Sequence, residues 1–337
     1  MNPGILPLTM TVWAQTRYGG ADTLEPTEVP VPAPGKKEVL LRIRATGLNS
    51  GDVRVMRGEP LLVRLAFGLC RPKNPVRGMD AAATVAAVGT GVESLAVGDE
   101  VIGELPGGAL APYAVVAASR LVTRPATLDA VTAATLPVAG GTAWQAFERA
   151  GMGGHGDLDG RRVLVIGASS GVGTFAVQLA ALRGAQVHAL CGERNRALVE
   201  SIGAVHTWDY RANDAATLPA ESYDLVIDIA GTAPLRTLQR LVVDGGVVAL
   251  VSGEGGRLFG PVGRILRANA LSLGSKRRLI PIAAVSRPDV LTELVALAAA
   301  GRITPVLERT WPFDRARDAM EHMDAGHAAG KVVVLAG

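Results

Sequence analysis

The apolar and polar residues of this chain follow two different rhythms. In residues 39–45 the odd positions are apolar and two of the even positions are arginine, which is the two-residue period of a half-buried strand. Short apolar runs separated by Gly and Pro turns follow at 81–88, 100–103 and 113–116. The sequence therefore predicts a compact β domain over residues 11–137.

From about residue 140, apolar runs alternate with helical stretches. The predicted strands are 163–166, 185–190, 225–229 and 247–251, and the predicted helices are 174–183, 195–202 and 287–300. This succession of strand, turn and helix predicts a parallel sheet with helices on both faces. The last apolar run, 331–335, predicts one more strand that could return to the β domain.

Composition limits the class of protein. A length of 337 residues suits two domains, and 48% hydrophobic against 19% charged residues excludes intrinsic disorder. A net charge of +3 gives no electrostatic case for nucleic acid. The two cysteines, Cys70 and Cys191, cannot form a disulfide framework or a four-cysteine zinc site, so we expect a reducing, cytoplasmic location.

Neither export nor membrane insertion is expected. Residues 1–10 lack the positive start and long apolar core of a signal peptide, so they predict a disordered leader. Residues 163–182 carry no charge, but Gly167, Gly171 and Gly173 would break a membrane-spanning helix in its middle. A buried strand, a glycine turn and a buried helix account for the same composition.

That glycine turn is the most informative motif. Residues 168–173 keep only the last glycine of the G-x-G-x-x-G pattern, yet they stand between a predicted strand and a predicted helix. Backbone N–H groups and the positive helix end can cradle a pyrophosphate there. The turn predicts dinucleotide binding, with contacts at Ser169, Ser170, Gly171, Val172 and Gly173.

A serine hydrolase is a competing reading of the same residues. Gly167 to Gly171 also fit G-x-S-x-G, which would make Ser169 a nucleophile, and four histidines lie downstream as possible bases. No His-Gly-Gly oxyanion segment precedes the motif, and a long β domain does. The hydrolase is therefore disfavoured but stays open.

The end of the second strand of the parallel sheet indicates which cofactor is used. NAD enzymes usually place an acid there for the ribose hydroxyls, but this chain has Leu190, Cys191 and Gly192, followed by Arg194. A guanidinium can pair with a 2′-phosphate, which favours NADPH. Against this, Arg194 could be a solvated surface residue, and Glu193 is an unfavourable neighbour for a phosphate.

Taken together, these patterns resemble the zinc-free quinone oxidoreductase (zeta-crystallin-like) branch of the medium-chain dehydrogenase/reductase superfamily, over nearly the whole chain. The segments that carry the resemblance are Arg17-Tyr-Gly-Gly, Val29-Pro-Val-Pro, Glu38-Val-Leu, Gly47-Leu-Asn-Ser-Gly-Asp52, Gly78-Met-Asp, Val97-Gly-Asp-Glu-Val101, Pro137-Val-Ala-Gly-Gly-Thr-Ala143, Gly167–Gly173 and Gly330-Lys-Val-Val. The resemblance implies an α/β protein: a GroES-like β domain (11–137 and 305–337) plus a Rossmann domain with a doubly wound parallel sheet (138–304).

The resemblance also implies the reaction. Zinc-dependent relatives hold their catalytic metal at positions that here are Asn49, Met79-Asp80 and Val138, which make no adequate ligand set. We therefore expect hydride transfer from NADPH, in the cleft between the domains, to a small electrophilic acceptor such as a quinone or an α,β-unsaturated carbonyl. A carbonyl or aldehyde reductase and a non-catalytic NADPH-binding protein stay open as alternatives.

Asn49 and Asp52 are the candidate catalytic residues, because in relatives their loop faces the nicotinamide. Asn49 could donate to the developing oxyanion and Asp52 could orient it or relay a proton. Both residue types also cap turns, which is the competing interpretation. The resemblance further implies a homodimer, and cofactor contacts at Thr142, Cys191, Gly192, Tyr210, Ala230, Val251, Ser252 and Lys331.

Overall fold

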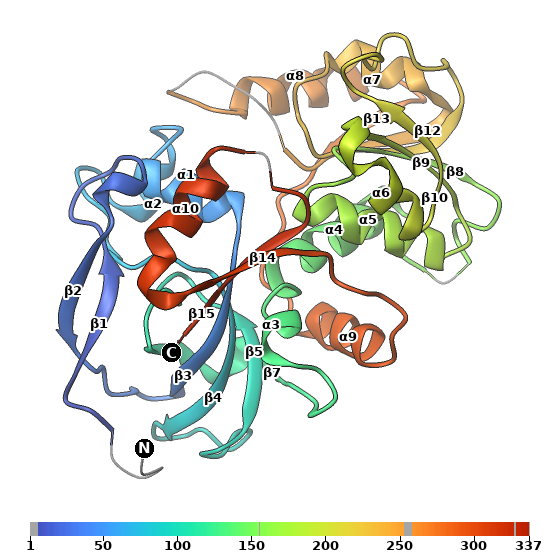
Figure 1. Cartoon of the computed structure of the whole chain (residues 1–337). Helices are drawn as coiled ribbons and strands as arrows, with labels where there is room; N and C mark the ends of the chain where they lie inside the picture. Colours follow the sequence, from blue (N-terminus) through green and yellow to red (C-terminus); the bar gives the residue numbers. More distant parts are fainter. Residues whose placement is uncertain (1–5, 155, 253–257, 327, 337) are drawn as a thin grey trace. The chain divides into compact units, whose positions relative to one another are not determined.

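The computed structural model describes residues 6–154, 156–252, 258–326 and 328–336. The chain forms two compact units (Figure 1). The first contains Met1–Val138, Ser286–Ala299 and Leu307–Gly337, and the second contains Ala139–Val285 and Ala300–Val306.

The first unit is built on strands, as the alternating pattern predicts. Its strands are β1 (Thr9–Ala14), β2 (Glu25–Pro30), β3 (Glu38–Leu48), β4 (Asp80–Val88), β5 (Glu100–Glu104), β6 (Tyr113–Ala117), β7 (Leu121–Thr123), β14 (Leu307–Pro312) and β15 (Lys331–Leu335). Its helices are α1 (Ser50–Arg57), α2 (Val63–Phe67), α3 (Ala130–Ala133), α9 (Pro288–Ala299) and α10 (Ala316–Asp324), with the 3-10 turns η1 (Ala21–Thr23), η2 (Ala118–Arg120) and η4 (Phe313–Arg315).

Strand β3 organises this unit. It pairs with β4, β6 and β15, within a sheet of order β14-β15-β3-β4-β5-β7. Val39, Leu41 and Ile43, the odd positions of the sequence pattern, are buried in one core cluster. Because β15 pairs with β3, the prediction that the last strand returns to the β domain is confirmed.

Two details differ from the sequence predictions. Thr9 and Met10 belong to β1 and pair with Pro30 and Val29, so the predicted leader is at least two residues too long; residues 1–5 lie outside the described part. The backbone pairing with β2 orders this segment. Helix α9 belongs to the first unit, where it packs on β7, whereas the predicted boundaries place residues 288–299 with the second domain.

The second unit follows the strand, turn and helix succession. Its strands are β8 (Arg162–Ile166), β9 (Gln186–Cys191), β10 (Ala204–Asp209), β11 (Tyr223–Asp228), β12 (Val242–Leu250) and β13 (Arg278–Pro281), and its helices are α5 (Gly171–Leu182), η3 (Glu193–Asn195), α6 (Arg196–Ser201), α7 (Leu235–Leu241) and α8 (Val262–Ser272). Helix α4 (Pro137–Ala150) leads into this unit. All six strands pair in parallel, in the order β10-β9-β8-β11-β12-β13.

This strand order creates a switch point between β8 and β11, because the chain winds outward from them in opposite directions. Side chains on both faces of β8 are buried: Leu164 packs in the cluster that contains α7 and α8 residues, and Val163 and Val165 are equally inaccessible. The sheet is therefore covered on both sides, and the predicted α/β class is confirmed. No helix among the described residues is long and apolar enough to cross a membrane.

Candidate functional site

Strand β8 ends at the glycine turn. Gly167 has a φ of +83°, a left-handed conformation that glycine adopts without strain. Ser170 caps α5, because its Oγ accepts a hydrogen bond from Gly173 N at 3.1 Å while its hydroxyl donates to Gly167 O at 2.8 Å. The helix itself supplies no partner for the N–H groups of Gly171 and Val172, so these groups are suited to bind an anion.

Gly173 is required by packing. A Cβ at this position would lie 2.2 Å from Gly167 O and 2.7 Å from the carbonyl carbon of Ala168. Any side chain would force the start of α5 away from the turn. This is the close approach for which the last glycine of dinucleotide-binding turns is used.

The loops after β11 and β12 lie at the same edge of the sheet as the turn. The carbonyl oxygen of Asp228 accepts hydrogen bonds from Val251 N at 2.9 Å and Ser252 N at 3.4 Å. On the other side, a Cβ built on Gly167 would lie 3.3 Å from Ala230 N. The structure thus brings Ala230, Val251 and Ser252 to the carboxyl edge at the switch point.

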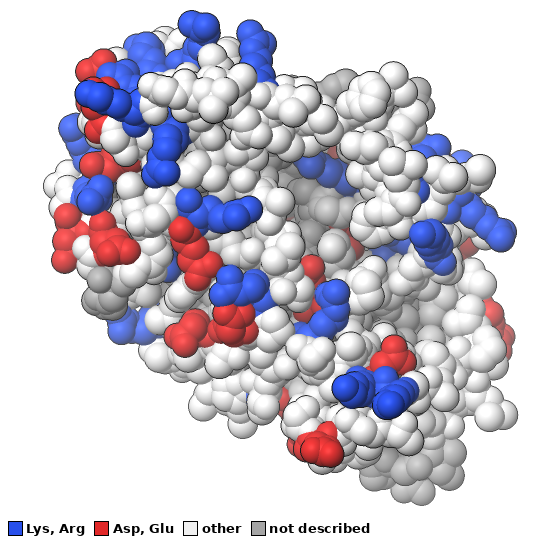
Figure 2. Space-filling model, turned by 180° about the vertical axis from the view of Figure 1, so that it is seen from behind, with Lys and Arg blue, Asp and Glu red and all other residues white. Residues whose placement is uncertain are grey.

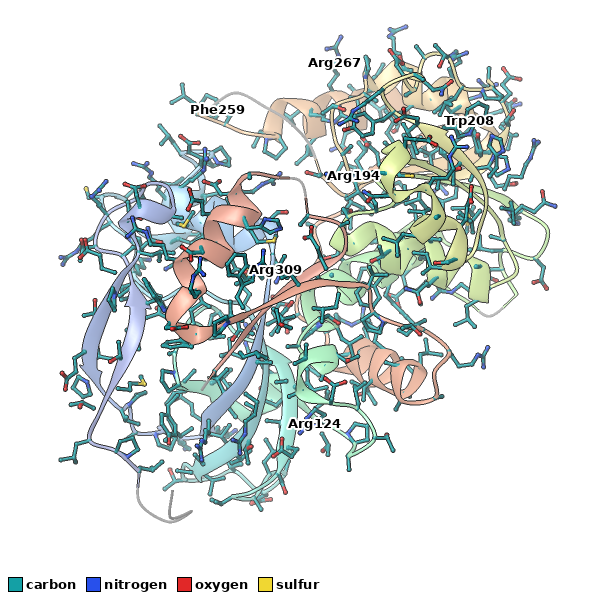
Figure 3. The ribbon with its side chains drawn as sticks, in the orientation of Figure 1. Arg124, Arg194, Trp208, Phe259, Arg267 and Arg309 are labelled. Atoms are coloured by element: carbon teal, nitrogen blue, oxygen red, sulfur yellow. The ribbon has the colours of Figure 1, made fainter. Side chains whose placement is uncertain are left out.

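The loop after β9 carries the residues from which the sequence predicts NADPH binding. Arg194 lies in η3, directly after the strand (Figure 3). Glu193, its unfavourable neighbour, forms an ion pair with Arg196 at 2.7 Å, which offsets its negative charge. Asn195 donates to Ser169 Oγ at 3.0 Å, so this loop is tied to the glycine turn.

Gly192 and Tyr210 pack together beside this loop. A Cβ on Gly192 would meet the Tyr210 ring at 3.2 Å, and Tyr210 N donates to Cys191 O at 3.1 Å. The Cys191 side chain is buried, so the backbone of this segment is the part suited to a ligand. The strand end thus places no carboxyl group where NAD enzymes carry an acid.

The hydrolase interpretation gains no support from the described histidines. Tyr223, the first residue of β11, places its hydroxyl 3.3 Å from His188 Nδ1, and the His188 and His206 rings lie 5.2 Å apart. These groups lie in the amino half of the sheet, whereas Ser169 lies at its carboxyl edge. His322 pairs with Glu308 in the first unit, and His327 lies outside the described residues.

In the first unit, Asn49 and Asp52 stand at the start of α1. Asp52 is buried, its Oδ2 accepts from Asn49 N at 3.0 Å and its Oδ1 accepts from Gly78 N at 3.0 Å. Asp52 therefore caps the helix and holds two loops together, as the competing interpretation expects. Asn49 has a different set of partners.

A buried lysine links Asn49 to Asp80. Lys331 Nζ donates to Leu48 O at 3.0 Å, to Asn49 Oδ1 at 2.6 Å and to Asp80 Oδ2 at 3.1 Å. Asn49 Nδ2 in turn donates to Asp80 Oδ2 at 2.9 Å and to Gly47 O at 3.3 Å. Val138 N donates to Asp80 Oδ1 at 3.0 Å, so Asp80 bonds to both other positions, Asn49 and Val138, while the ammonium group contacts Asn49 and Asp80.

Burial shifts the acid groups of this cluster. Desolvation raises the pKa of Asp52 to about 6, and the Asp80 carboxylate adds to the shift against the opposing effects of the Asn49 and Gly78 amides and of Lys331. Desolvation and then Asp80 raise the pKa of Glu104 to about 7, while Arg120 opposes the shift. Burial thus raises the pKa of both carboxyl groups above the usual range.

Two predicted cofactor residues belong to other elements than the loops at the carboxyl edge of the second sheet. Thr142 lies on α4. Lys331 lies on β15 of the first unit, only 2% exposed, and a direct contact with a cofactor would require it to break one of its three hydrogen bonds. Sequence reasoning missed the Lys331–Asp80 pair; the available signal was a lysine at the head of an otherwise apolar strand.

Among the described residues, no group of three or more His, Cys, Asp or Glu side chains could hold a metal ion. The zinc-ligand positions carry an amide, a lysine-bound carboxylate and an aliphatic side chain. This donor set suits an ammonium ion better than zinc, which is usually bound by thiolate and imidazole.

Comparisons with known proteins agree with this architecture. A model of the alcohol dehydrogenase GroES-like domain matches residues 35–126, and one of zinc-binding dehydrogenases matches residues 202–334. The chain is 36% identical to a chloroplast envelope quinone oxidoreductase homolog of Arabidopsis thaliana, over 94% of this chain and 95% of that protein. It is 29% identical to the NADPH-dependent alkenal/one oxidoreductase of Arabidopsis thaliana, over 98% of this chain and 80% of that protein.

A solved structure shares the fold. The quinone oxidoreductase of Coxiella burnetii superposes with a TM-score of 0.84 over 97% of this chain and 99% of that chain, at 23% identity. The GroES-like domain and the parallel-sheet domain expected from the sequence are thereby confirmed.

Proposed function

Because the chain belongs to the quinone oxidoreductase branch of the medium-chain dehydrogenase/reductase family, we propose that it transfers a hydride from NADPH to a quinone or an α,β-unsaturated carbonyl compound without zinc. The names of the relatives support both acceptor classes. The observation that carries the proposal is the hydrogen-bonded cluster of Asn49, Asp80 and Lys331, in which Asn49 and Asp80 stand at implied metal positions and Lys331 supplies the positive charge.

The cofactor would be held by the second unit. The N–H groups at the start of α5 bind the pyrophosphate, and Gly173 lets the backbone approach it. Arg194 pairs with the 2′-phosphate, and the Tyr210 ring beside Gly192 lies on the adenine side. NADPH supplies the hydride when it is bound.

Asn49 would stabilise charge on the acceptor oxygen. Its bond to Gly47 O is the longer of its two donated bonds, at 3.3 Å, so this N–H is the one to be transferred to a substrate oxygen. The bond that Lys331 donates to Asn49 Oδ1 draws electron density from the amide and makes its N–H groups better donors. Such a donor acts mainly in the transition state, as a metal does in related enzymes.

Asp52 and Lys331 would act as positioning residues. Asp52 fixes the start of α1 through Asn49 N, and Lys331 fixes the orientation of the Asn49 amide. A carbonyl or aldehyde reductase would use the same donor, and the acceptor panel below separates it from the proposed activity.

We propose a homodimer in a reducing, cytoplasmic location. In the second unit β13 is the edge strand of the sheet. Nearby, Leu266 on helix α8 (63% exposed) and Leu273, which directly follows that helix (82% exposed), face solvent. A free edge next to exposed apolar side chains is typical of a surface that pairs with a second copy. The molar mass in solution tests the dimer, and imaging of a tagged chain tests the location.

The test of function follows the absorbance of NADPH with quinones, enones and aldehydes in parallel, with and without a chelator. We expect turnover with quinones or enones, weaker turnover with aldehydes, no effect of the chelator, and far less than one zinc per chain by elemental analysis. Cofactor binding without turnover of any acceptor would favour the non-catalytic NADPH-binding protein. Stoichiometric zinc, or loss of activity on chelation, would contradict the metal-free mechanism.

A further inference from the structure

A cavity lies in the second unit, between the start of α7 and helix α8. The cavity has a volume of about 320 Å³. Three arginines line it, Arg236 from α7 and Arg264 and Arg267 from α8, and no acidic residue is among the described residues of its wall. Figure 2 shows Lys and Arg side chains gathered over this part of the molecule, at the upper left of the view. None of these arginines is among the predicted cofactor contacts.

Arg264 is held rigidly in the cavity wall. Its Nη2 donates to the buried Asp228 carboxylate at 2.9 Å and its Nη1 donates to Ala233 O at 2.8 Å. Its Nε is buried and has no hydrogen-bond partner within the described part of the chain. These two hydrogen bonds fix the guanidinium before any ligand binds, so binding would cost little further side-chain entropy.

Asp228 does not cancel the charge of the cavity. Its Oδ1 is already occupied by Gly231 N at 2.9 Å, and its side chain is fully inaccessible behind Arg264. Arg236 and Arg267 are exposed, and no ion pair ties either of them to a described residue. The cavity therefore carries two positive charges beyond the Arg264–Asp228 pair.

The spacing along α8 directs its groups to the cavity. Gly263, Arg264, Arg267 and Leu271 fall on one side of the helix, whereas the exposed Leu266 lies on another. Figure 3 marks Arg267 on this helix. A Cβ built on Gly263 would have no atom within 4 Å, so the backbone at the first turn of α8 is open on the cavity side. The positive end of this eleven-residue helix adds to the charge of the arginines.

We propose that this cavity binds a small phosphate-bearing molecule at a site separate from the cofactor. Donors reach the cavity from two helices and from a helix N-terminus, which suits a tetrahedral phosphate better than a planar carboxylate that one guanidinium fork can satisfy. Pro234, Leu235 and Leu271 supply an apolar wall for the uncharged body of the ligand.

Titration calorimetry with inorganic pyrophosphate, at constant ionic strength and with saturating NADPH present, tests the proposal. We expect saturable binding to one site, weakened at least tenfold by Arg267→Glu and by Arg236→Glu. Arg302→Glu, which reverses an exposed charge elsewhere in the same unit, serves as the matched control and should change the affinity less than twofold. Arg194→Ala should also change the affinity for pyrophosphate less than twofold, which separates this site from the proposed 2′-phosphate contact.

A melting curve for each variant shows whether it is folded. Absence of pyrophosphate binding in the unmutated chain would overturn the proposal, as would equal weakening by Arg302→Glu, since that result means a general charge effect. Loss of binding in Arg194→Ala would assign the anion to the cofactor cradle instead. Citrate binding as tight as that of pyrophosphate would overturn the assignment to phosphate. These outcomes do not depend on whether the protein reduces quinones.

Discussion

Lys331 Nζ lies 2.6 Å from Asn49 Oδ1, and this contact decides which way the Asn49 amide faces. An ammonium group only donates, so the oxygen of Asn49 must point to Lys331 and the NH₂ group must point to Asp80 and Gly47. The ammonium group of Lys331, on the last strand, thus orients the amide donor of Asn49 at the start of α1.

Removing this ammonium should destabilise the chain strongly. Lys331→Met leaves the fully buried Asp80 carboxylate without its cationic partner, and breaking a buried pair from one side costs about 3–5 kcal/mol. Urea unfolding measures the loss. Adding Asp80→Asn should recover part of it, and the exposed Lys276→Met should change little. Unchanged stability of Lys331→Met would mean that the pair has no structural role.

Replacing Asn49 tests the proposed oxyanion donor. If one of its N–H groups transfers to the substrate oxygen, Asn49→Ala should lower kcat by about 10²-fold and leave the Kd of NADPH nearly unchanged. The variant also loses bonds to Asp80 and Lys331, so a melting curve must accompany the kinetics. A folded Asn49→Ala variant that reduces its acceptor at the unmutated rate would make Asn49 a purely structural residue.

The stability of the chain should depend on the protonation of Asp52. Its pKa is raised from 3.8 to about 6, so the folded state binds a proton that the unfolded state has already released. The contribution of this proton to the free energy of unfolding is fully present below about pH 4. It is lost as the pH rises through 6, by about 3 kcal/mol in total. Urea unfolding of the unmutated chain and of Asp52→Asn between pH 5 and pH 7.5 should show a smaller fall in the variant. Parallel profiles would contradict the raised pKa.

Much of the fold could be predicted from the sequence because it rests on local periodicity. Alternation predicted β3, and apolar runs beside glycines predicted β8 and the start of α5. The Lys331 contacts could not be predicted in this way, since Asn49 lies 282 positions earlier in the chain. Helix α8 was also missed: its apolar residues are exposed on one side, while its buried side carries an arginine paired with Asp228.

The central claim is that this chain uses NADPH, and the comparison of NADPH with NADH tests it most directly. Dissociation constants for both cofactors should be measured on the unmutated chain, on Arg194→Ala and on the control Arg302→Ala. The account predicts that the unmutated chain and the control bind NADPH at least tenfold tighter than NADH, about 1.4 kcal/mol, and that Arg194→Ala loses most of this preference. Equal affinities of the unmutated chain for the two cofactors would contradict it.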